Sequence, residues 1–232
     1  MSTRTDGRDT RWAQHRAQRR RELVEAALRA IRHHGPGVGM DEISAEAGTS
    51  KTVVYRHFRD RTGLYAAVVE SVDQRILDSL HAATAGRDPA SEHPLAMVGP
   101  MVDAFLQLVE KDPEIYRFVV NRPLVDGPVE DDPVAGLADR IGAQVSRALK
   151  AHLERQGRDA SCAPTWGHGL VGFVRAAADQ WLSSDMARPR SAVVADVTTL
   201  FAPALAATGT TAYDPAATHT THAPTHTEDT DS

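Results

Sequence analysis

The sequence lacks several features on which proteins of other classes depend. It has a single cysteine, Cys162, which excludes an intramolecular disulfide and is typical of a reducing compartment. No apolar run approaches the ~18 residues that a membrane-spanning helix needs, and the first residues lack the apolar core of a signal peptide. We therefore expect a cytoplasmic protein without a membrane partner.

Motifs of common active sites are also missing. The sequence contains no Gly-x-Ser-x-Gly, no His-Glu-x-x-His and no phosphate-binding loop ending in Gly-Lys-Ser or Gly-Lys-Thr. Dispersed catalytic groups remain compatible with this absence, but no pattern argues for an enzyme. His219, His222 and His226 have a spacing that could bind a metal, yet their Thr-, Ala- and Pro-rich surroundings favour a flexible tail. We expect no metal and no cofactor.

Charge is unevenly distributed along the chain, although the formal net charge is only −5 at pH 7. Residues 1–61 carry 13 Lys and Arg against 8 Asp and Glu, whereas the remainder carries 13 against 23. A basic end on an acidic body attracts an anionic polymer at that end and repels it elsewhere. The distribution therefore favours a nucleic-acid partner that meets the N-terminal third in one orientation.

Apolar residues recur at helical spacing through most of the chain, without the alternation and hairpin turns of a β-sheet. With 232 residues, 41% of them apolar, the chain can bury a substantial core. We assign helix N-caps to Asp60, Asp112 and Asp132, the last two directly before a proline. The predicted helices cover residues 16–33, 50–58, 61–85, 94–110, 113–121, 133–156, 165–183 and 191–206, with a further short helix ahead of Gly48. The fold class is all-α.

Residues 40–65 carry the most specific pattern. They predict a short helix, a turn at Gly48, a second short helix over 50–58 and the capped start of a third. The apolar side chains of the first two helices can face inward: Ile43, Ala47, Val54 and Phe58. The side chains left outside are basic, hydroxylic or aromatic, which suits the major groove of DNA: Lys51, Thr52, Tyr55, Arg56 and His57.

This segment resembles the DNA-binding motif of the TetR family of transcriptional regulators. The matches are Ile43-Ser44, Ala47-Gly48-Thr49-Ser50, Tyr55-Arg56-His57-Phe58 and Asp60-Arg61. Gly39 stands where the family usually has a capping Thr, so a hydroxyl contact to phosphate is lost, although Glu42 can still bind the cap N–H. Arg61 replaces the usual Lys and keeps its charge. The resemblance is strong over residues 17–65.

The resemblance implies an N-terminal three-helix helix-turn-helix DNA-binding domain joined by a long helix to a C-terminal helical ligand-binding and dimerisation bundle. We expect a disordered arm over residues 1–15, the DNA-binding domain over 16–61, the bundle over 62–207 and a disordered tail over 208–232. Arg4, Arg8 and Arg11 could reach a minor groove, but a solvated tail is the favoured interpretation. The expected DNA-binding residues are Ser50, Lys51, Thr52, Tyr55, Arg56, His57 and Arg61. Within this set, Tyr55 and His57 resemble family residues that grip phosphates.

The body carries two further candidate sites. Its aromatic residues could line an apolar ligand cavity, although each one alone is as compatible with a plain core: Phe105, Tyr116, Phe118, Trp166, Phe173 and Trp181. Residues 167–172 match Gly-x-Gly-x-x-Gly, but no strand precedes them, which favours helix packing over a dinucleotide site. The expected dimer interface consists of Gly169, Gly172, Ala176, Val193, Val197, Leu200 and Phe201.

The sequence therefore predicts a homodimeric transcriptional repressor that a small, largely apolar inducer releases from a palindromic, double-stranded operator. Two alternatives remain open. The body could be an enzyme fused to a DNA-binding head, or the dimer could bind DNA constitutively without an inducer. Repression and activation are not distinguished at this stage.

Overall fold

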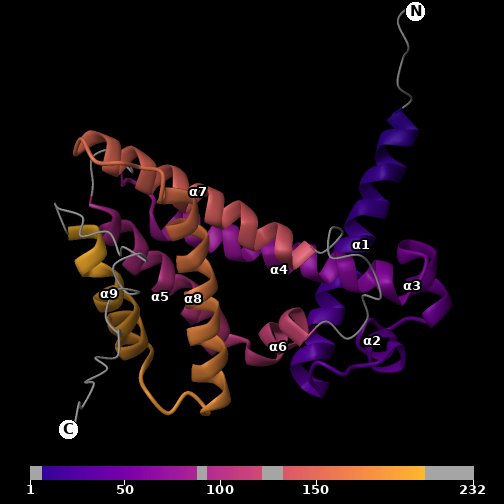
Figure 1. Ribbon diagram of the computed structural model, residues 1–232. Coiled ribbons are helices and arrows are strands. Elements are labelled where there is room, and N and C mark those ends of the chain that lie inside the picture. The colour runs from indigo at the N-terminus through magenta and orange to yellow at the C-terminus, as the bar shows by residue number, and fades with distance from the viewer. Residues whose placement is uncertain (1–6, 88–92, 122–132, 207–232) are drawn as a thin grey trace, which may run out of the picture.

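The computed structural model describes residues 7–87, 93–121 and 133–206, and this part of the chain is entirely helical, which confirms the all-α class. Figure 1 shows a small group of helices at one end joined by α4 to a larger group at the other. The elements are α1 (Gly7–His34), α2 (Met40–Glu46), α3 (Lys51–Phe58), α4 (Arg61–Ala83), α5 (Pro94–Lys111), α6 (Pro113–Asn121), α7 (Pro133–Arg155), α8 (Ala163–Ser183) and α9 (Arg190–Ala206). None of them combines the length and the apolar character of a membrane span.

The smaller group, which we call the head, consists of α1, α2, α3 and the start of α4. Its core is centred on Leu28, Val54 and Leu64, none of which has any exposed surface. α1 begins at Gly7, well before the predicted residue 16, so residues 7–15 are helical where a disordered arm was expected. The cause is that this stretch is polar apart from Trp12 and Ala13, so it has no apolar period to detect, while its Arg, Gln and Ala residues favour helix.

A close backbone approach fixes α3 against α4. The Asp60 side chain caps α4 as predicted, accepting a hydrogen bond of 2.7 Å from the Gly63 N–H. A Cβ atom on Gly63 would lie 2.1 Å from the Phe58 carbonyl oxygen, so only glycine fits at this contact. α4 then continues into the other group of helices, which we call the body (Figure 1). A movement of α4 would therefore carry α3 with it.

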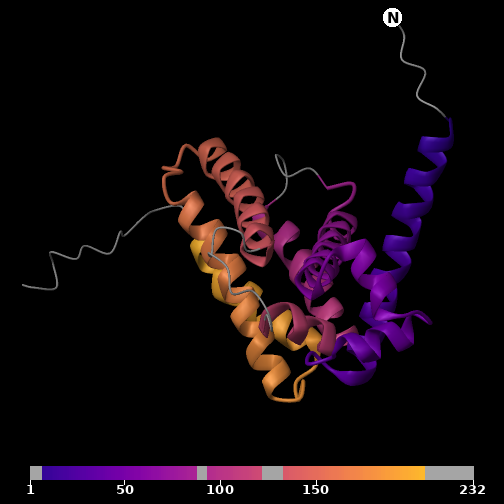
Figure 2. The same cartoon turned by 90° about the vertical axis from the view of Figure 1, so that its right-hand side faces the viewer.

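The body consists of the rest of α4 and α5 to α9, and one face of α6 also contributes to the core of the head. α8 packs on α7 at Gly167, where an added Cβ would lie 2.8 Å from the Gly142 carbonyl oxygen and 2.6 Å from the Ser146 N–H nitrogen. Figure 2 shows α9 beside α8 on the side of the body away from α1. The predicted bounds of α6 are confirmed, and those of α4, α5, α7, α8 and α9 agree to within two residues.

Candidate nucleic-acid interface and cavity

A short turn sets the angle between α2 and α3. The N–H of Gly39 donates to the Glu42 carboxylate at 3.0 Å, which is the cap contact expected from the sequence. After α2, the N–H groups of Gly48 and Thr49 bond back to the carbonyls of Ala45 and Ser44, each at 3.0 Å. These bonds use backbone groups left open at the end of α2. α3 therefore starts from a fixed position relative to the core.

α3 divides into an inner and an outer face as predicted. Val54 and Phe58 are buried, and the Arg20 guanidinium lies 4.3 Å from the centre of the Phe58 ring. Arg20 also donates to the His57 carbonyl oxygen at 2.9 Å, which ties the end of α3 to α1. The exposed side chains on the outer face are those of Ser50, Lys51, Thr52, Tyr55 and Arg56. One ion pair joins this face to α2.

That ion pair joins Lys51 to Asp41 on α2, with Nζ 2.6 Å from the carboxylate. The hydrogen bond to Asp41 raises the pKa of Lys51, whose amine is charged at any physiological pH in either case. To bind a DNA group, Lys51 must give up its ion pair with Asp41. The loss of this pair offsets part of the free energy that Lys51 gains from DNA. Sequence patterns did not indicate this competition.

His57 is the one member of the predicted DNA-binding set on α3 that is partly buried. Burial lowers the pKa of His57, and the neighbouring cations Arg56, Arg19 and Arg20 lower it further. The imidazole is therefore neutral at pH 7 and offers one N–H donor rather than a second charge. Arg19 and Arg20 were not among the predicted DNA-facing residues, because periodicity does not tell which side of a long helix adjoins α3.

Arg61, at the start of α4, is held by Tyr65. Its Nε donates to the Tyr65 hydroxyl at 3.0 Å, and the Tyr65 hydroxyl donates to the Val38 carbonyl oxygen at 2.6 Å. The guanidinium also lies 5.0 Å from the Tyr65 ring centre. The charge is thus positioned at a helix N-terminus, where free N–H groups also favour an anion.

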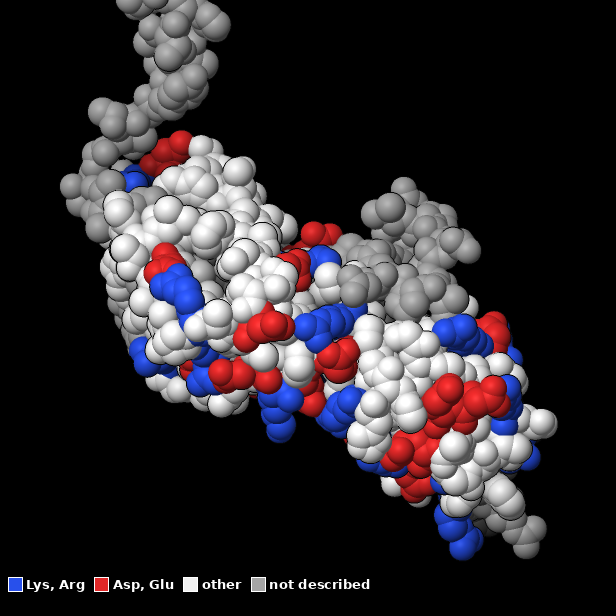
Figure 3. Space-filling view, turned by 90° about the horizontal axis from the view of Figure 1, so that it is seen from below, with Lys and Arg blue, Asp and Glu red and all other residues white. Residues whose placement is uncertain are grey.

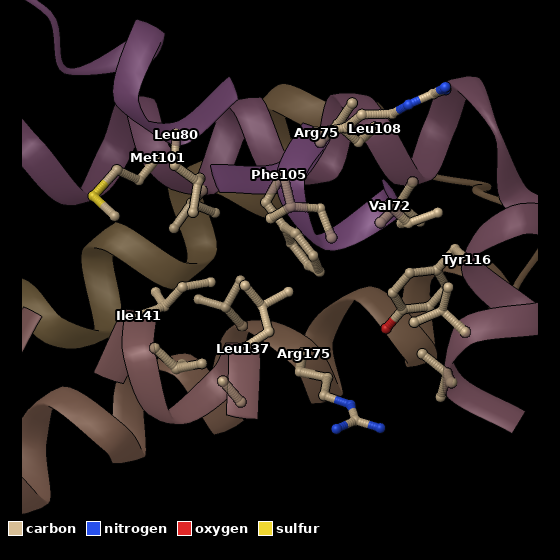
Figure 4. A pocket seen from close by; sticks show the side chains of 18 of the residues that line it. Val72, Arg75, Leu80, Met101, Phe105, Leu108, Tyr116, Leu137, Ile141 and Arg175 are labelled. Carbon is tan, nitrogen blue, oxygen red and sulfur yellow. The ribbon is translucent and has the colours of Figure 1, made fainter. Parts of the chain in front are cut away.

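A cavity of about 170 Å³ lies inside the body, between α4, α5, α6, α7 and α8. Its wall is almost entirely aliphatic and aromatic, and Figure 4 shows Phe105, Leu137 and Ile141 pointing into it from opposite sides. Three charged side chains also belong to the wall: Arg75, Asp112 and Arg175. A concave apolar space with few polar groups is typical of small-molecule sites.

Only two of the six predicted cavity residues, Phe105 and Tyr116, line this space. Phe118 instead packs against Tyr65, with ring centres 4.9 Å apart, and belongs to the core of the head. Trp166 is half-buried near the start of α8, and Phe173 is exposed on α8. Trp181 is buried and donates its indole N–H to the Arg188 carbonyl oxygen at 2.8 Å. The prediction is thus corrected for four residues, since sequence spacing does not tell which aromatic side chains meet.

Two of the charged wall residues are ion-paired with α1. Arg32 binds Asp112 through two hydrogen bonds, of 2.6 and 3.0 Å, and this bond is the main reason that the pKa of Asp112 is lowered. Arg75 on α4 is paired with Glu25 through a single hydrogen bond. The cavity wall is thereby attached to the longest helix of the head at two points. No sequence signal indicated either pair.

The predicted dimer residues separate into an outer and an inner set. Gly169, Gly172 and Ala176 are exposed on α8, and Leu200 on α9 is 58% exposed. Phe201 lies against Phe173, with ring centres 5.4 Å apart. Figure 3 shows uncharged surface over much of the left-hand part of the molecule, interrupted by several charged side chains.

Val193 and Val197, by contrast, are buried within the body, at 7% and 1% exposure, so their assignment to a subunit surface was wrong. They pack in the same apolar cluster as Trp181. The Gly-x-Gly-x-x-Gly match lies inside α8, with no strand before it in the described chain, so it has no dinucleotide-binding context. The three histidines at 219, 222 and 226 lie outside the described residues.

Comparison with known proteins agrees with this architecture. Residues 88–217 match the model of the tetracyclin repressor-like C-terminal domain, and residues 23–68 match that of the bacterial regulatory proteins of the tetR family. An uncharacterized HTH-type transcriptional regulator of Mycobacterium tuberculosis is 33% identical over 186 residues, which are 79% of this chain and 76% of that protein.

Two further proteins extend the comparison. The HTH-type transcriptional activator FasR of Mycolicibacterium smegmatis is 29% identical over 179 residues, covering 73% of this chain and 75% of its own length. The regulator FadR of Bacillus subtilis, solved in complex with stearoyl-CoA, shares the fold with a TM-score of 0.61 at 13% identity, over 77% of this chain and 95% of that one. Because the matches span both the helix-turn-helix and the body, the chain belongs to the TetR family of DNA-binding, helix-turn-helix transcriptional regulators.

Proposed function

We propose that the chain acts as a homodimer that occupies a near-palindromic, double-stranded operator and that leaves it when a small, largely apolar inducer binds in the body. Each subunit inserts α3 into one major groove, with Lys51 and Thr52 toward base edges and Tyr55, His57 and Arg61 toward phosphates. Base contacts then supply sequence preference, and phosphate contacts supply register and affinity. The enzyme alternative is excluded because the TetR family is non-enzymatic.

The observation that carries the ligand-responsive part is the double attachment of the cavity wall to the head. Asp112 and Arg75 belong to the wall and are paired with Arg32 and Glu25 of α1. A ligand that spreads the wall would change the distance between these partners and so would shift the head relative to the body. Only a ligand with different affinities for the two arrangements can change DNA affinity, and the pairs would transmit that difference from the wall to α1.

Homodimerisation is supported by the exposed apolar surface on α8 and α9. Phe173 and Leu200 are 38% and 58% exposed, and Phe173 packs edge-on against Phe201 of α9. Such a patch on a regulator marks a protein contact. Sedimentation should give a mass of about 50 kDa, twice the 25.1 kDa chain. Leu200→Glu should yield monomers, whereas Trp12→Glu, at an exposed position on α1, should leave the dimer intact. A wild-type monomer at micromolar concentration contradicts the model.

The inducer test starts from an operator selected out of random DNA. Operator affinity is measured by fluorescence anisotropy with and without a library of apolar compounds, among them acyl chains because the Bacillus subtilis relative was solved with stearoyl-CoA. A hit should lose its effect in Ile141→Trp, which fills the cavity, and keep it in the surface control Arg147→Gln. If no compound changes either thermal stability or operator affinity, the constitutive dimer is the correct alternative. Tighter operator binding with the ligand would identify an activator-like or corepressor response instead.

A further inference from the structure

The three charged residues of the cavity wall are not equivalent. Arg75 is paired with Glu25, and Asp112 is paired with Arg32. Arg175 on α8 also belongs to the wall, and it is only partly exposed, but within the described chain it forms no ion pair. A guanidinium at the edge of an apolar space, without an ion-pair partner, offers several N–H donors to an anion. The wall therefore has one polar position left open.

A second polar group lies at the same end of the cavity. Tyr116 donates its hydroxyl hydrogen to the Asp179 carboxylate at 2.6 Å. Burial raises the pKa of Tyr116, and the bond to Asp179 raises it further, so the hydroxyl stays protonated. Figure 4 shows the Tyr116 hydroxyl directed to the side on which Arg175 lies. The opposite end, around Leu80 and Met101, is apolar.

We infer that the ligand is an amphipath with an anionic tip, whose apolar chain fills the cavity and whose carboxylate or phosphate pairs with Arg175. The inference rests on the proposed ligand-binding function and specifies its chemistry. A guanidinium binds either oxyanion through two parallel hydrogen bonds, which also fixes the orientation of the chain. Asp179 lies one helical turn from Arg175, and its negative charge would repel the same anion. The hydrogen bond from Tyr116 partly offsets this charge.

Substitutions at Arg175 and Asp179 should change the affinity for an anion-tipped ligand in opposite directions. Arg175→Gln removes the positive partner and should weaken binding of an anion-tipped chain by about tenfold to a hundredfold. Asp179→Asn removes the opposing negative charge and should leave the same binding equal or stronger. Arg147→Gln, an exposed arginine on α7 that does not line the cavity, serves as the matched control and should bind as the wild type does.

The experiment measures binding of decanoate, decyl phosphate, decanol and decylamine to the full-length dimer by isothermal titration calorimetry. Both anions should bind more tightly than decanol, and decylamine most weakly, with the difference between anion and alcohol lost in Arg175→Gln. The stronger of decanoate and decyl phosphate then identifies the preferred tip. If all four bind alike and Arg175→Gln changes nothing, the anionic-tip inference is overturned while the cavity remains a ligand site. If none of the four compounds binds to the wild type or to Ile141→Trp, the proposed ligand-binding function itself is contradicted.

Discussion

The head and the body are both built from helices, but they use apolar side chains in opposite ways. In the head, side chains from α1, α2, α3, α4 and α6 fill the interior, and Leu28, Val54 and Leu64 have no exposed surface. In the body, apolar side chains from five helices surround about 170 Å³ that they do not fill. A DNA-reading surface needs a fixed geometry, whereas a ligand site needs space, so one chain combines a tightly packed head with a hollow body.

The largest expected effect tests this difference in packing. Phe58→Ala in the head should lower the free energy of unfolding by about 3–5 kcal/mol, because the buried ring leaves a cavity in a filled core. Phe105→Ala in the cavity wall should cost clearly less, because part of that ring already faces empty space and forfeits few contacts. Urea denaturation measures both. Equal losses would mean that the body is as tightly packed around Phe105 as the head is around Phe58.

The next largest effect is a difference in stability between alanine substitutions at three glycines of α8. Gly167→Ala should destabilise the body by about 1–3 kcal/mol, because the new methyl group meets the backbone of α7. Gly169→Ala is the matched control, since nothing lies within 4 Å of its added Cβ, and alanine favours helix by up to about 1 kcal/mol. Gly172→Ala should behave like Gly169→Ala in the monomer. A stable Gly167→Ala protein would show that the α7–α8 contact is loose.

Within the head, alanine substitutions at base-contacting and at phosphate-contacting residues should change DNA binding in different ways. Lys51→Ala or Thr52→Ala should reduce the preference for operator over scrambled DNA by about 1–3 kcal/mol. Arg61→Ala should weaken binding to both DNAs alike and should lower the slope of log K against log salt by about one per half-site. A salt series on both DNAs tests the two statements together. If Lys51→Ala alters only the salt slope, Lys51 contacts the backbone, and preference resides elsewhere on α3.

The smallest expected effect concerns the link between the two regions. Hydrogen bonding to Arg32 lowers the pKa of Asp112, so the pair stabilises the fold above the ordinary pKa of an aspartate and loses this contribution as pH falls through the lowered value. The stability difference between wild type and Asp112→Asn should therefore shrink in acid. Asp112→Asn should also weaken the coupling between ligand and operator, by about 0.5–2 kcal/mol. The control, Asp196→Asn on α9, interrupts an ion pair with Arg188 away from the head and should leave this coupling unchanged.

The sequence predicted the head better than the body for a physical reason. Helix boundaries and the two faces of α3 follow from caps, a turn and periodicity, all of which act over a few residues, as at Asp60, Gly48 and Val54. The membership of the cavity depends on how distant helices cross, so Phe118 and Trp181 were assigned wrongly. The pairs that join α1 to Asp112 and Arg75 span many residues and leave no periodic trace. The start of α1 was missed because a polar helix lacks the apolar stripe on which detection depends.

Selection of binding sites from a random DNA pool tests the central claim most directly, namely that α3 carries a sequence-reading surface on a dimer. The wild-type protein should enrich a sequence with two-fold symmetry, whose half-sites lie about one helical turn or a multiple of it apart. Thr52→Ala should relax the enrichment at the same position in both half-sites, whereas Arg147→Gln on the body should enrich the wild-type sequence. If the wild-type protein enriches no sequence over the starting pool, the assignment of α3 as the DNA-reading helix is contradicted.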